Sequence, residues 1–380
     1  MKVRYLTAAL VLVCACQGPT LAQTSVEERL QRMEQRIEQL EQRVAAQERT
    51  IMEKDKRISE LVAPGDGWFD TVEVSGAVEV EATHEKSDEG ESSSGLEAAT
   101  VDVAVAARVN AWTAADVALT MDGDGKIEVD EAFVTLAPPD SALSAIAGRQ
   151  GLPFGVYESG MVSDPLTMDL GDTAGDAIQL AFDADGLSAS AFLFKGDNDR
   201  GGDDRIENFG VSASYAIERD GTSFALGLSW INDIGESGLL SEIEERGSGM
   251  VAGGAASLVA DFAGMTVIAE YVTAMDEFTP GELSFGPAGK GARPSAWMME
   301  AAYGFELGGR PTTVALGYQG TEEAASLDLP RNRFLVGFSV ELAEALSLGL
   351  EWSRDRDYGG SADGSGKTAN KATALLAAEF

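Results

Sequence analysis

Apolar residues recur along the chain with two different periods, and the change falls near residue 68. From Val26 to Leu61 they follow alternating steps of four and three, the heptad spacing of a coiled-coil seam. After Trp68 the period is two, as at Phe334, Val336 and Phe338, and clusters of Gly, Asp, Asn and Ser separate segments of about ten residues. Such a repeat is typical of strands in a transmembrane β-barrel. A soluble all-β sandwich is the alternative, but its outward faces should carry charge.

The region from 68 to 380 is predicted to form an all-β, 16-stranded antiparallel barrel, with 14 strands as the alternative count. The connections alternate between long and short, which is typical of extracellular loops and periplasmic turns. The short connection at 123–126 is an exception, because a long one is expected there. The sixteen segments begin near 72, 96, 112, 127, 142, 176, 187, 208, 223, 250, 265, 296, 311, 333, 346 and 370. The long connections are expected at 83–95, 150–175, 196–207, 232–249, 274–295, 320–332 and 356–369.

The heptad region, residues 23–63, is predicted to be a periplasmic coiled coil, and residues 64–67 a linker. Basic residues at the g positions and acidic residues at e favour parallel self-association. A single solvated helix with local Glu–Arg pairs is the alternative. Dimer and trimer both fit the seam, and a trimer is favoured only because porins commonly trimerise. The seam consists of Leu30, Met33, Ile37, Leu40, Val44, Ile51, Ile58 and Leu61.

Residues 1–22 have the pattern of a secretory signal: Lys2 and Arg4 precede a short apolar run, and small residues follow it. Both cysteines, Cys14 and Cys16, lie in this segment, so disulfides and thiolate metal sites are not expected beyond it. A lipoprotein cleavage box is the alternative. The formal net charge of −35 argues against nucleic-acid binding. An outer-membrane location follows from the signal and the barrel pattern together.

Little in the chain suggests catalysis or a resident cofactor. The run from Asp122 to Ile127 resembles part of a calcium loop, but an Asp-Gly hairpin turn accounts for Asp122 and Asp124 equally well and strands flank them. The single histidine, His84, is assigned to the first long loop, and no nucleophile-elbow sequence accompanies it. The sequence therefore predicts a protein that is not an enzyme and holds no metal.

The connection at 150–175 is the longest in the chain and the third on the outer side, where general porins carry a loop that folds inward and narrows the channel. Opposed charges across such a constriction select solutes. An ordinary exposed loop is the alternative. The constriction candidates are Arg149, Glu158, Asp164, Asp169 and Asp172. The last segment ends on Phe380, which resembles the signal that the barrel assembly machinery reads.

Several segments together resemble the LbtU family of siderophore porins. They are Val129–Phe133, Gly148–Arg149, Pro153–Gly155, Glu158, Met161–Thr167, Glu207–Gly210, Glu270–Ala274, Ala315–Thr321 and Leu329–Pro330. The resemblance implies a channel that admits ferric siderophores or similar small solutes without a plug domain. Asp130 and Glu131, in the first segment, join the pore candidates by their charge.

The acidity of the chain fits this function poorly, since residues 64–380 hold 18 basic and 54 acidic side chains, a net charge of −36. Such a barrel should repel anionic ferric complexes, unless most carboxylates lie on outer loops and bind divalent ions that bridge lipopolysaccharide. A general, cation-preferring diffusion porin is therefore the alternative function. A structural tether, acting through the coiled coil, is a third.

Overall fold

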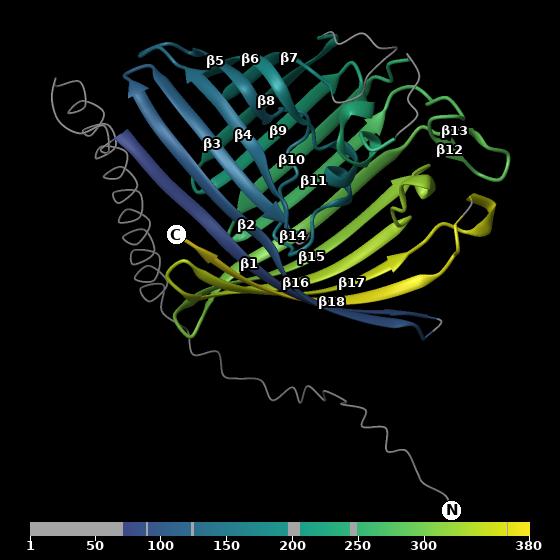
Figure 1. Cartoon of the computed structure of the whole chain (residues 1–380). Coiled ribbons are helices and arrows are strands. Elements are labelled where there is room, and N and C mark those ends of the chain that lie inside the picture. Colours follow the sequence, from purple (N-terminus) through teal and green to yellow (C-terminus); the bar gives the residue numbers. More distant parts are fainter. Residues whose placement is uncertain (1–70, 89, 123–124, 197–205, 244–248, 363) are drawn as a thin grey trace, which may run out of the picture. The chain divides into compact units, whose positions relative to one another are not determined.

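The computed structural model describes residues 71–380 except 89, 123–124, 197–205, 244–248 and 363. In this part of the chain sixteen antiparallel strands form one closed barrel (Figure 1), which confirms the predicted strand number and fold class. A further pair of two-residue strands forms a small hairpin within one connection. The predicted signal, coiled coil and linker lie outside the described residues.

Each strand of the barrel pairs with its neighbours along the chain, and β1 pairs with β18 to close the cylinder. The first nine strands are β1 (Val72–Ser87), β2 (Ser92–Asn110), β3 (Thr113–Asp122), β4 (Ile127–Leu136), β5 (Leu143–Gly151), β6 (Ala174–Ala184), β7 (Leu187–Phe194), β8 (Asn208–Arg219) and β9 (Thr222–Ile231). The others are β10 (Gly253–Phe262), β11 (Met265–Ala274), the hairpin β12 (Ser284–Phe285) and β13 (Lys290–Gly291), β14 (Ser295–Leu307), β15 (Arg310–Glu322), β16 (Asn332–Ala343), β17 (Leu346–Arg356) and β18 (Thr368–Glu379).

Along the strands, apolar side chains on the outer face alternate with side chains that face the lumen, as a barrel surrounded by lipid requires. On β6, Ile178 and Leu180 are 58% and 62% exposed on the outer face, while the residue before them, Ala177, is buried. The strands begin within four residues of their predicted starts, because a period-two pattern with polar interruptions marks a strand that has one apolar face. None of the helices in the described residues has the length and hydropathy of a membrane-spanning helix.

The seam between β1 and β18 is closed by Phe380. Its backbone N–H donates to the carbonyl of Gly76 and its carbonyl accepts from the N–H of Gly76, both at 3.0 Å. A Cβ at position 76 would lie 2.4 Å from the carbonyl oxygen of Asp102 and 2.6 Å from the ring of Phe380. Glycine is therefore required where β2 and the ring of Phe380 approach β1 this closely.

The first predicted long loop is wrong. Residues 83–95 continue β1 and β2 as a paired hairpin up to Lys86 and Ser92, and His84 lies in β1 with its Nδ1 2.9 Å from Oγ of Ser94. Polar residues occupy both faces of this hairpin and most are exposed, so the apolar alternation that marks a lipid-facing strand is lost while the backbone pairing continues. The pattern therefore predicted an irregular loop where the ladder persists.

The connections divide the two ends of the barrel. One end, here called the long-loop rim, carries the connections 152–173, 232–252, 275–294, 323–331 and 357–367. The other end, the short-turn rim, carries turns such as those at 185–186, 263–264 and 344–345, as predicted. Short helices lie within four of the long connections. They are α2 (Leu166–Gly171), η2 (Ile234–Glu236), η3 (Gly238–Leu240), η4 (Ala325–Leu327) and η5 (Gly360–Ala362).

Candidate constriction site in the barrel lumen

The connection between β5 and β6, residues 152–173, runs along the inner wall of the barrel and is called the inward loop below. Its backbone and side chains form hydrogen bonds with residues of β9, β11, β14, β15 and β17, 74 to 189 positions away in the sequence. Phe154, Leu166 and Leu170 of this loop are fully buried. An ordinary exposed loop, the alternative reading of the sequence, would make no such contacts.

Glu270 of β11 is the first of three glutamates that hold the inward loop. Its Oε1 accepts from the backbone N–H of Val156 at 2.7 Å, and its Oε2 accepts from the N–H of Tyr157 at 3.2 Å. The hydroxyl of Thr167 also donates to Oε2, at 2.8 Å. One carboxylate thus binds both the beginning of the loop and its short helix, α2.

Glu300 of β14 and Glu351 of β17 hold the middle of the loop in the same way. Glu300 accepts from the N–H of Gly160 at 2.7 Å and from the hydroxyl of Ser159 at 2.8 Å. Glu351 accepts from the N–H of Val162 at 2.8 Å, and from the N–H and hydroxyl of Ser163 at 3.1 and 2.6 Å. Hydrogen bonds to ionised acceptors are about twice as strong as neutral ones, so these contacts fix the path of the loop. We call Glu270, Glu300 and Glu351 the glutamate clamp.

Two neutral side chains of the wall add to the clamp. Oε1 of Gln319 accepts from the N–H of Leu166 at 3.0 Å, and Oγ of Ser229 accepts from the N–H of Gly155 at 3.0 Å. Backbone N–H groups that the loop leaves without secondary structure are thereby satisfied by side chains of the barrel. In these contacts the loop supplies the hydrogen-bond donors, and the side chains of the wall supply the acceptors.

Tyr157 fastens the loop to itself. Its hydroxyl donates to the carbonyl of Phe154, and burial, followed by the negative charges of Glu270 and Asp172, raises the pKa of this phenol. The phenol therefore stays protonated and remains a donor throughout the physiological range. A Cβ at Gly171 would lie 2.4 Å from this hydroxyl oxygen, so the small residue lets α2 pack against the ring.

The acidic residues predicted for the constriction lie on the lumenal side of the inward loop. Glu158, Asp164 and Asp172 are exposed, and Asp169 is half-buried in α2. Burial, and then the charge of Glu351, raise the pKa of Asp164. Burial also raises the pKa of Asp172, and the charges of Asp130 and Asp164 add to this effect.

The wall formed by β1 to β4 presents more carboxylates toward this acidic loop. Glu79 on β1 interacts electrostatically with Asp164 of the loop and with Asp102 on β2. On β4, Asp130 interacts with Asp172 of the loop, and Glu131 with Asp116 of β3. The structure thus brings Asp130 close to Asp172 of the loop, with Glu131 beside Asp130. Acidic groups face one another, rather than facing the basic groups that the sequence suggested.

The prediction that Arg149 lines the constriction is wrong. Arg149 pairs with Asp176 on β6, and Asp176 shares its face with the exposed Ile178 and Leu180, so the register places Arg149 on the outer face. Its Nε donates to the carbonyl of Val129 at 2.9 Å, just beyond the last β4–β5 pair. The arginine therefore caps the backbone of β4 where the ladder ends.

In the part of the chain that the structure describes, two basic residues of the inner wall are paired with carboxylates. Arg333 of β16 forms a bidentate contact with Asp355 of β17, with Nε to Oδ1 at 2.9 Å and the second bond at 3.0 Å. Nζ of Lys371 lies 3.7 Å from a carboxylate oxygen of Glu81. These pairs leave the carboxylates of the loop and of β1 to β4 as the excess charge of the lumen. The described residues contain no group of three or more Asp, Glu, His or Cys side chains placed to hold a metal ion.

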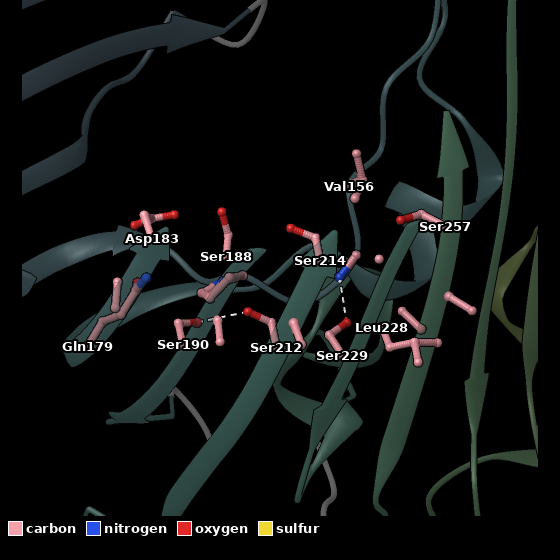
Figure 2. A pocket seen from close by; sticks show the side chains of 18 residues that line it. Val156, Gln179, Asp183, Ser188, Ser190, Ser212, Ser214, Leu228, Ser229 and Ser257 are labelled. Atoms are coloured by element: carbon pink, nitrogen blue, oxygen red, sulfur yellow. Dashed lines mark hydrogen bonds between the residues drawn. The ribbon is translucent and has the colours of Figure 1, made fainter. Parts of the chain in front are cut away.

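A second part of the lumen, lined mainly by hydroxyl groups and by one carboxylate, Asp183, lies beside the start of the inward loop. A cavity of about 250 Å³ is bounded by Pro153, Gly155 and Val156 of the loop and by the inner faces of β6 to β10. Figure 2 shows the hydroxyls along this wall, including the hydrogen bond between Ser190 and Ser212 at 2.8 Å. The hydroxyl-bearing residues are Ser188, Ser190, Ser212, Ser214, Ser229 and Ser257. The lumen therefore has an acidic side and a hydroxyl-lined side.

Asp169 should make the charge of the lumen depend on pH. Burial raises its pKa to about 6, Arg333 lowers it, and Asp164 and Asp355 raise it further. It lines a cavity of about 680 Å³ at the long-loop rim together with Glu242, Glu282 and Asp328. Because the raised pKa keeps the carboxyl neutral at pH 5 and lets it ionise by pH 7, the negative charge of the lumen is expected to increase over this interval with a midpoint near 6. Reversal potentials measured for the wild type and Asp169→Asn check this, since the variant should show no such step.

Sequence reasoning found the loop but missed the residues that hold it. Glu300 and Glu351 were not identified, and Glu270 and Gln319 appeared only within segments of family resemblance. All four lie on lumenal faces, and on β15 and β17 the other lumenal residues are mostly small, such as Gly317 and Ser353. A long polar side chain among small lumenal ones indicates a wall residue that holds a loop. The sequence does not show which loop that residue contacts.

Comparisons with known proteins agree with the barrel. No family model matches the chain. A UPF0422 protein of Coxiella burnetii (strain RSA 493 / Nine Mile phase I) is 27% identical over 270 residues, which cover 66% of this chain and 57% of that protein. The UPF0422 protein lpl2888 of Legionella pneumophila (strain Lens) is 30% identical over 251 residues, 60% of this chain and 46% of that protein. The chain thus spans about half the length of the curated relatives it matches.

Solved structures with a similar fold are outer-membrane porins and channels. OprB of Pseudomonas putida has a TM-score of 0.58 at 10% identity, covering 82% of this chain and 94% of that one. The outer membrane channel DcaP of Acinetobacter baumannii has a TM-score of 0.55 at 14% identity, covering 81% and 97%. The anion-selective porin from Comamonas acidovorans has a TM-score of 0.54 at 12% identity, covering 82% and 99%. At these identities the likeness establishes the fold, which is that of an outer-membrane porin.

Proposed function

We propose that the barrel is an outer-membrane diffusion channel for small solutes that passes cations in preference to anions. The observation that carries this proposal is the acidic inward loop, clamped on one wall and facing the acidic wall of β1 to β4. A general porin needs a stable constriction inside a closed barrel, and this loop has the contacts to form one. The protein would act without catalysis and without a resident cofactor.

The charge around the loop decides which ions pass most easily. Exposed charges are screened within about 8 Å at physiological ionic strength, so carboxylates on outer loops affect an ion in the lumen little. Asp164 and Glu79 are close enough to interact electrostatically, so an ion that passes beside them is attracted by both carboxylates. A narrow passage with one sign of charge raises the local concentration of counter-ions. Cations are therefore favoured even though Arg333 and Lys371 also face the lumen.

The orientation follows from the connections. In bacterial barrels the long loops are extracellular and the short turns periplasmic. The long-loop rim would thus face the outside, and the hydroxyl-lined cavity beside Val156 would lie below the outer entrance of the constriction. Uncharged hydroxylated solutes would find hydrogen-bonding groups on that side.

Planar-bilayer electrophysiology on the purified protein tests the proposal directly. Under a gradient of potassium chloride, the reversal potential is expected to have the sign of potassium preference, and the preference should weaken as ionic strength rises. A reversal potential with the sign of chloride preference would overturn the cation proposal. An insulating barrel that is folded and inserted would overturn the channel itself.

A second candidate function is uptake of ferric siderophores, which the resemblance to the LbtU family suggests. Two of the resembling segments, Pro153–Gly155 and Met161–Thr167, lie in the inward loop. Two others, Glu270–Ala274 and Ala315–Thr321, contain clamp residues or Gln319. Several of the segments that carry the resemblance thus help to build the constriction. The acidic lumen limits this candidate to ferric complexes without net negative charge.

Uptake of labelled ferric complexes separates the two candidates. A strain that lacks the protein should lose uptake of a neutral or cationic ferric hydroxamate and keep that of a ferric carboxylate complex. Unchanged uptake of both would remove the siderophore candidate and leave the diffusion channel standing. Assembly as a trimer, contact with the assembly machinery through Phe380 and binding of lipopolysaccharide remain predictions.

A further inference from the structure

The outer face of β17 carries two arginines near the long-loop rim. Along this face the residues are Leu350, Trp352, Arg354 and Arg356, in order toward the rim, and all four side chains are exposed. The lumenal residues between them include Glu351 and Asp355. Apolar, aromatic and cationic residues thus follow one another on the surface that faces lipid.

This order matches the layers of a membrane leaflet. Trp and Tyr are enriched where hydrocarbon meets the headgroups. Trp352 packs edge-on against Phe334 at 6.2 Å, and Trp297 packs edge-on against Tyr318 at 5.2 Å, so a group of aromatic rings lies on this part of the outer face. A strand rises about 3.3 Å per residue, so Arg354 and Arg356 lie about 7 and 13 Å along the strand beyond Trp352. That is the level of lipid headgroups.

Neither arginine has an acidic partner among the described residues. Arg354 pairs across the sheet with Phe334 and Asn370, and Arg356 with Asn332 and Thr368, which are all uncharged. The neighbouring Arg333, on the lumenal face, is held by Asp355 instead. In a chain with a net charge of −35, two adjacent cations without carboxylates favour an anionic ligand from outside the protein.

The two arginines line one shallow cavity. Its volume is about 470 Å³, and it opens on the outer face between β15 and β18. The hydroxyl of Tyr318 donates to Oδ1 of Asn332 at 3.2 Å at its edge. The lining includes Tyr318, Asn332, Phe334, Arg354, Arg356 and Thr368. Two guanidinium groups two residues apart on one strand face point the same way and can contact the oxygens of one phosphate.

We infer that this cavity binds the phosphate of a lipid headgroup in the leaflet that surrounds the long-loop rim. Guanidinium groups bind phosphate through paired hydrogen bonds, and the aromatic rings beside the arginines position the rest of the same lipid. The inference rests on the proposed function in one respect only, the orientation that decides which leaflet surrounds the long-loop rim. With long loops outside, the ligand is a phosphorylated glycolipid of the outer leaflet.

Native mass spectrometry of the delipidated full chain in neutral detergent tests this inference. The probes are phosphorylated lipid A, the same lipid A with its phosphates removed, and inorganic phosphate. The test variant is Arg354→Gln/Arg356→Gln. The matched control is Arg219→Gln/Arg331→Gln, which removes the same charge from two exposed arginines outside the cavity. Heat-modifiable mobility on gels confirms that each variant is folded.

The expected result is that phosphorylated lipid A binds the wild type and the control alike, and the test variant about tenfold or more weakly. Dephosphorylated lipid A should bind the wild type as weakly as the phosphorylated form binds the test variant. Equal binding to wild type and test variant would overturn the inference, as would equal binding of the two lipids. Binding of inorganic phosphate without lipid binding would overturn the lipid as ligand. Conductance of the same samples reports on the channel independently.

Discussion

Replacing Glu270, Glu300 and Glu351 together with alanine is expected to raise the single-channel conductance and to make the current noisy. The three carboxylates accept eight hydrogen bonds from the inward loop at 2.6 to 3.2 Å, in addition to one of 3.4 Å from Tyr157 to Glu270. Without these acceptors, several backbone N–H groups of the loop lack a hydrogen-bond partner at the wall. The free energy of the loop is then lower when these groups move away from the wall and donate to water.

The size of the effect follows from the strength of these bonds. A hydrogen bond to a charged group contributes about 1.5–3 kcal/mol, and a two-state equilibrium shifts from 99:1 to 1:99 with about 5.5 kcal/mol. Loss of all three carboxylates therefore suffices to release the loop, even though Leu166 and Leu170 still favour the docked position. Each single variant should give an intermediate conductance, with fast transitions between two levels.

A matched control keeps the interpretation clear. The triple variant Glu306→Ala/Glu341→Ala/Glu344→Ala removes the same number of carboxylates near the short-turn rim, where no contact with the inward loop exists among the described residues. Its conductance should equal that of the wild type. If the clamp variant were folded and conducted like this control, the loop would not be the constriction.

The fold could be predicted from the sequence because each strand carries its own signal. A lipid-facing strand needs an apolar residue at every second position, and Phe334, Val336 and Phe338 satisfy this without reference to any other strand. Turn residues such as Asp185 and Gly186, both with positive φ, mark the ends just as locally. The paired hairpin around His84 was not predicted, because polar residues occupy both of its faces and no apolar alternation marks it.

The constriction could be predicted only in part, because its geometry depends on pairs far apart in the sequence. Loop length and acidity pointed to Asp164 and Asp172, but Glu351, which accepts from the N–H of Val162 in the same loop, lies 189 residues from that donor. The strand pattern shows which face of β17 carries Glu351, but not that this side chain meets the loop. Arg149 shows the opposite failure. Its position next to the loop suggested a pore residue, while a register set by the pairing with Asp176 places it on the outer face.

Neutralising the loop itself should change selectivity without opening the channel. In the triple variant Glu158→Gln/Asp164→Asn/Asp172→Asn the side chains keep their size and the glutamate clamp stays intact, so the conductance should change little. A carboxylate about 4 Å from a passing cation contributes about 1 kcal/mol even in water and more at lower dielectric. The ratio of cation to anion permeability is therefore expected to fall about tenfold or more, measured as the reversal potential in a salt gradient.

The chain offers a control for this variant with equal change in charge. Asp140, Asp185 and Asp220 lie in turns at the short-turn rim with φ between 52° and 60°, a conformation that asparagine also adopts readily. Replacing these three aspartates with asparagine should leave the selectivity close to that of the wild type, because an ion at the constriction is screened from them. An equal loss of cation preference in both triple variants would mean that the overall charge of the barrel, rather than the inward loop, selects the ions.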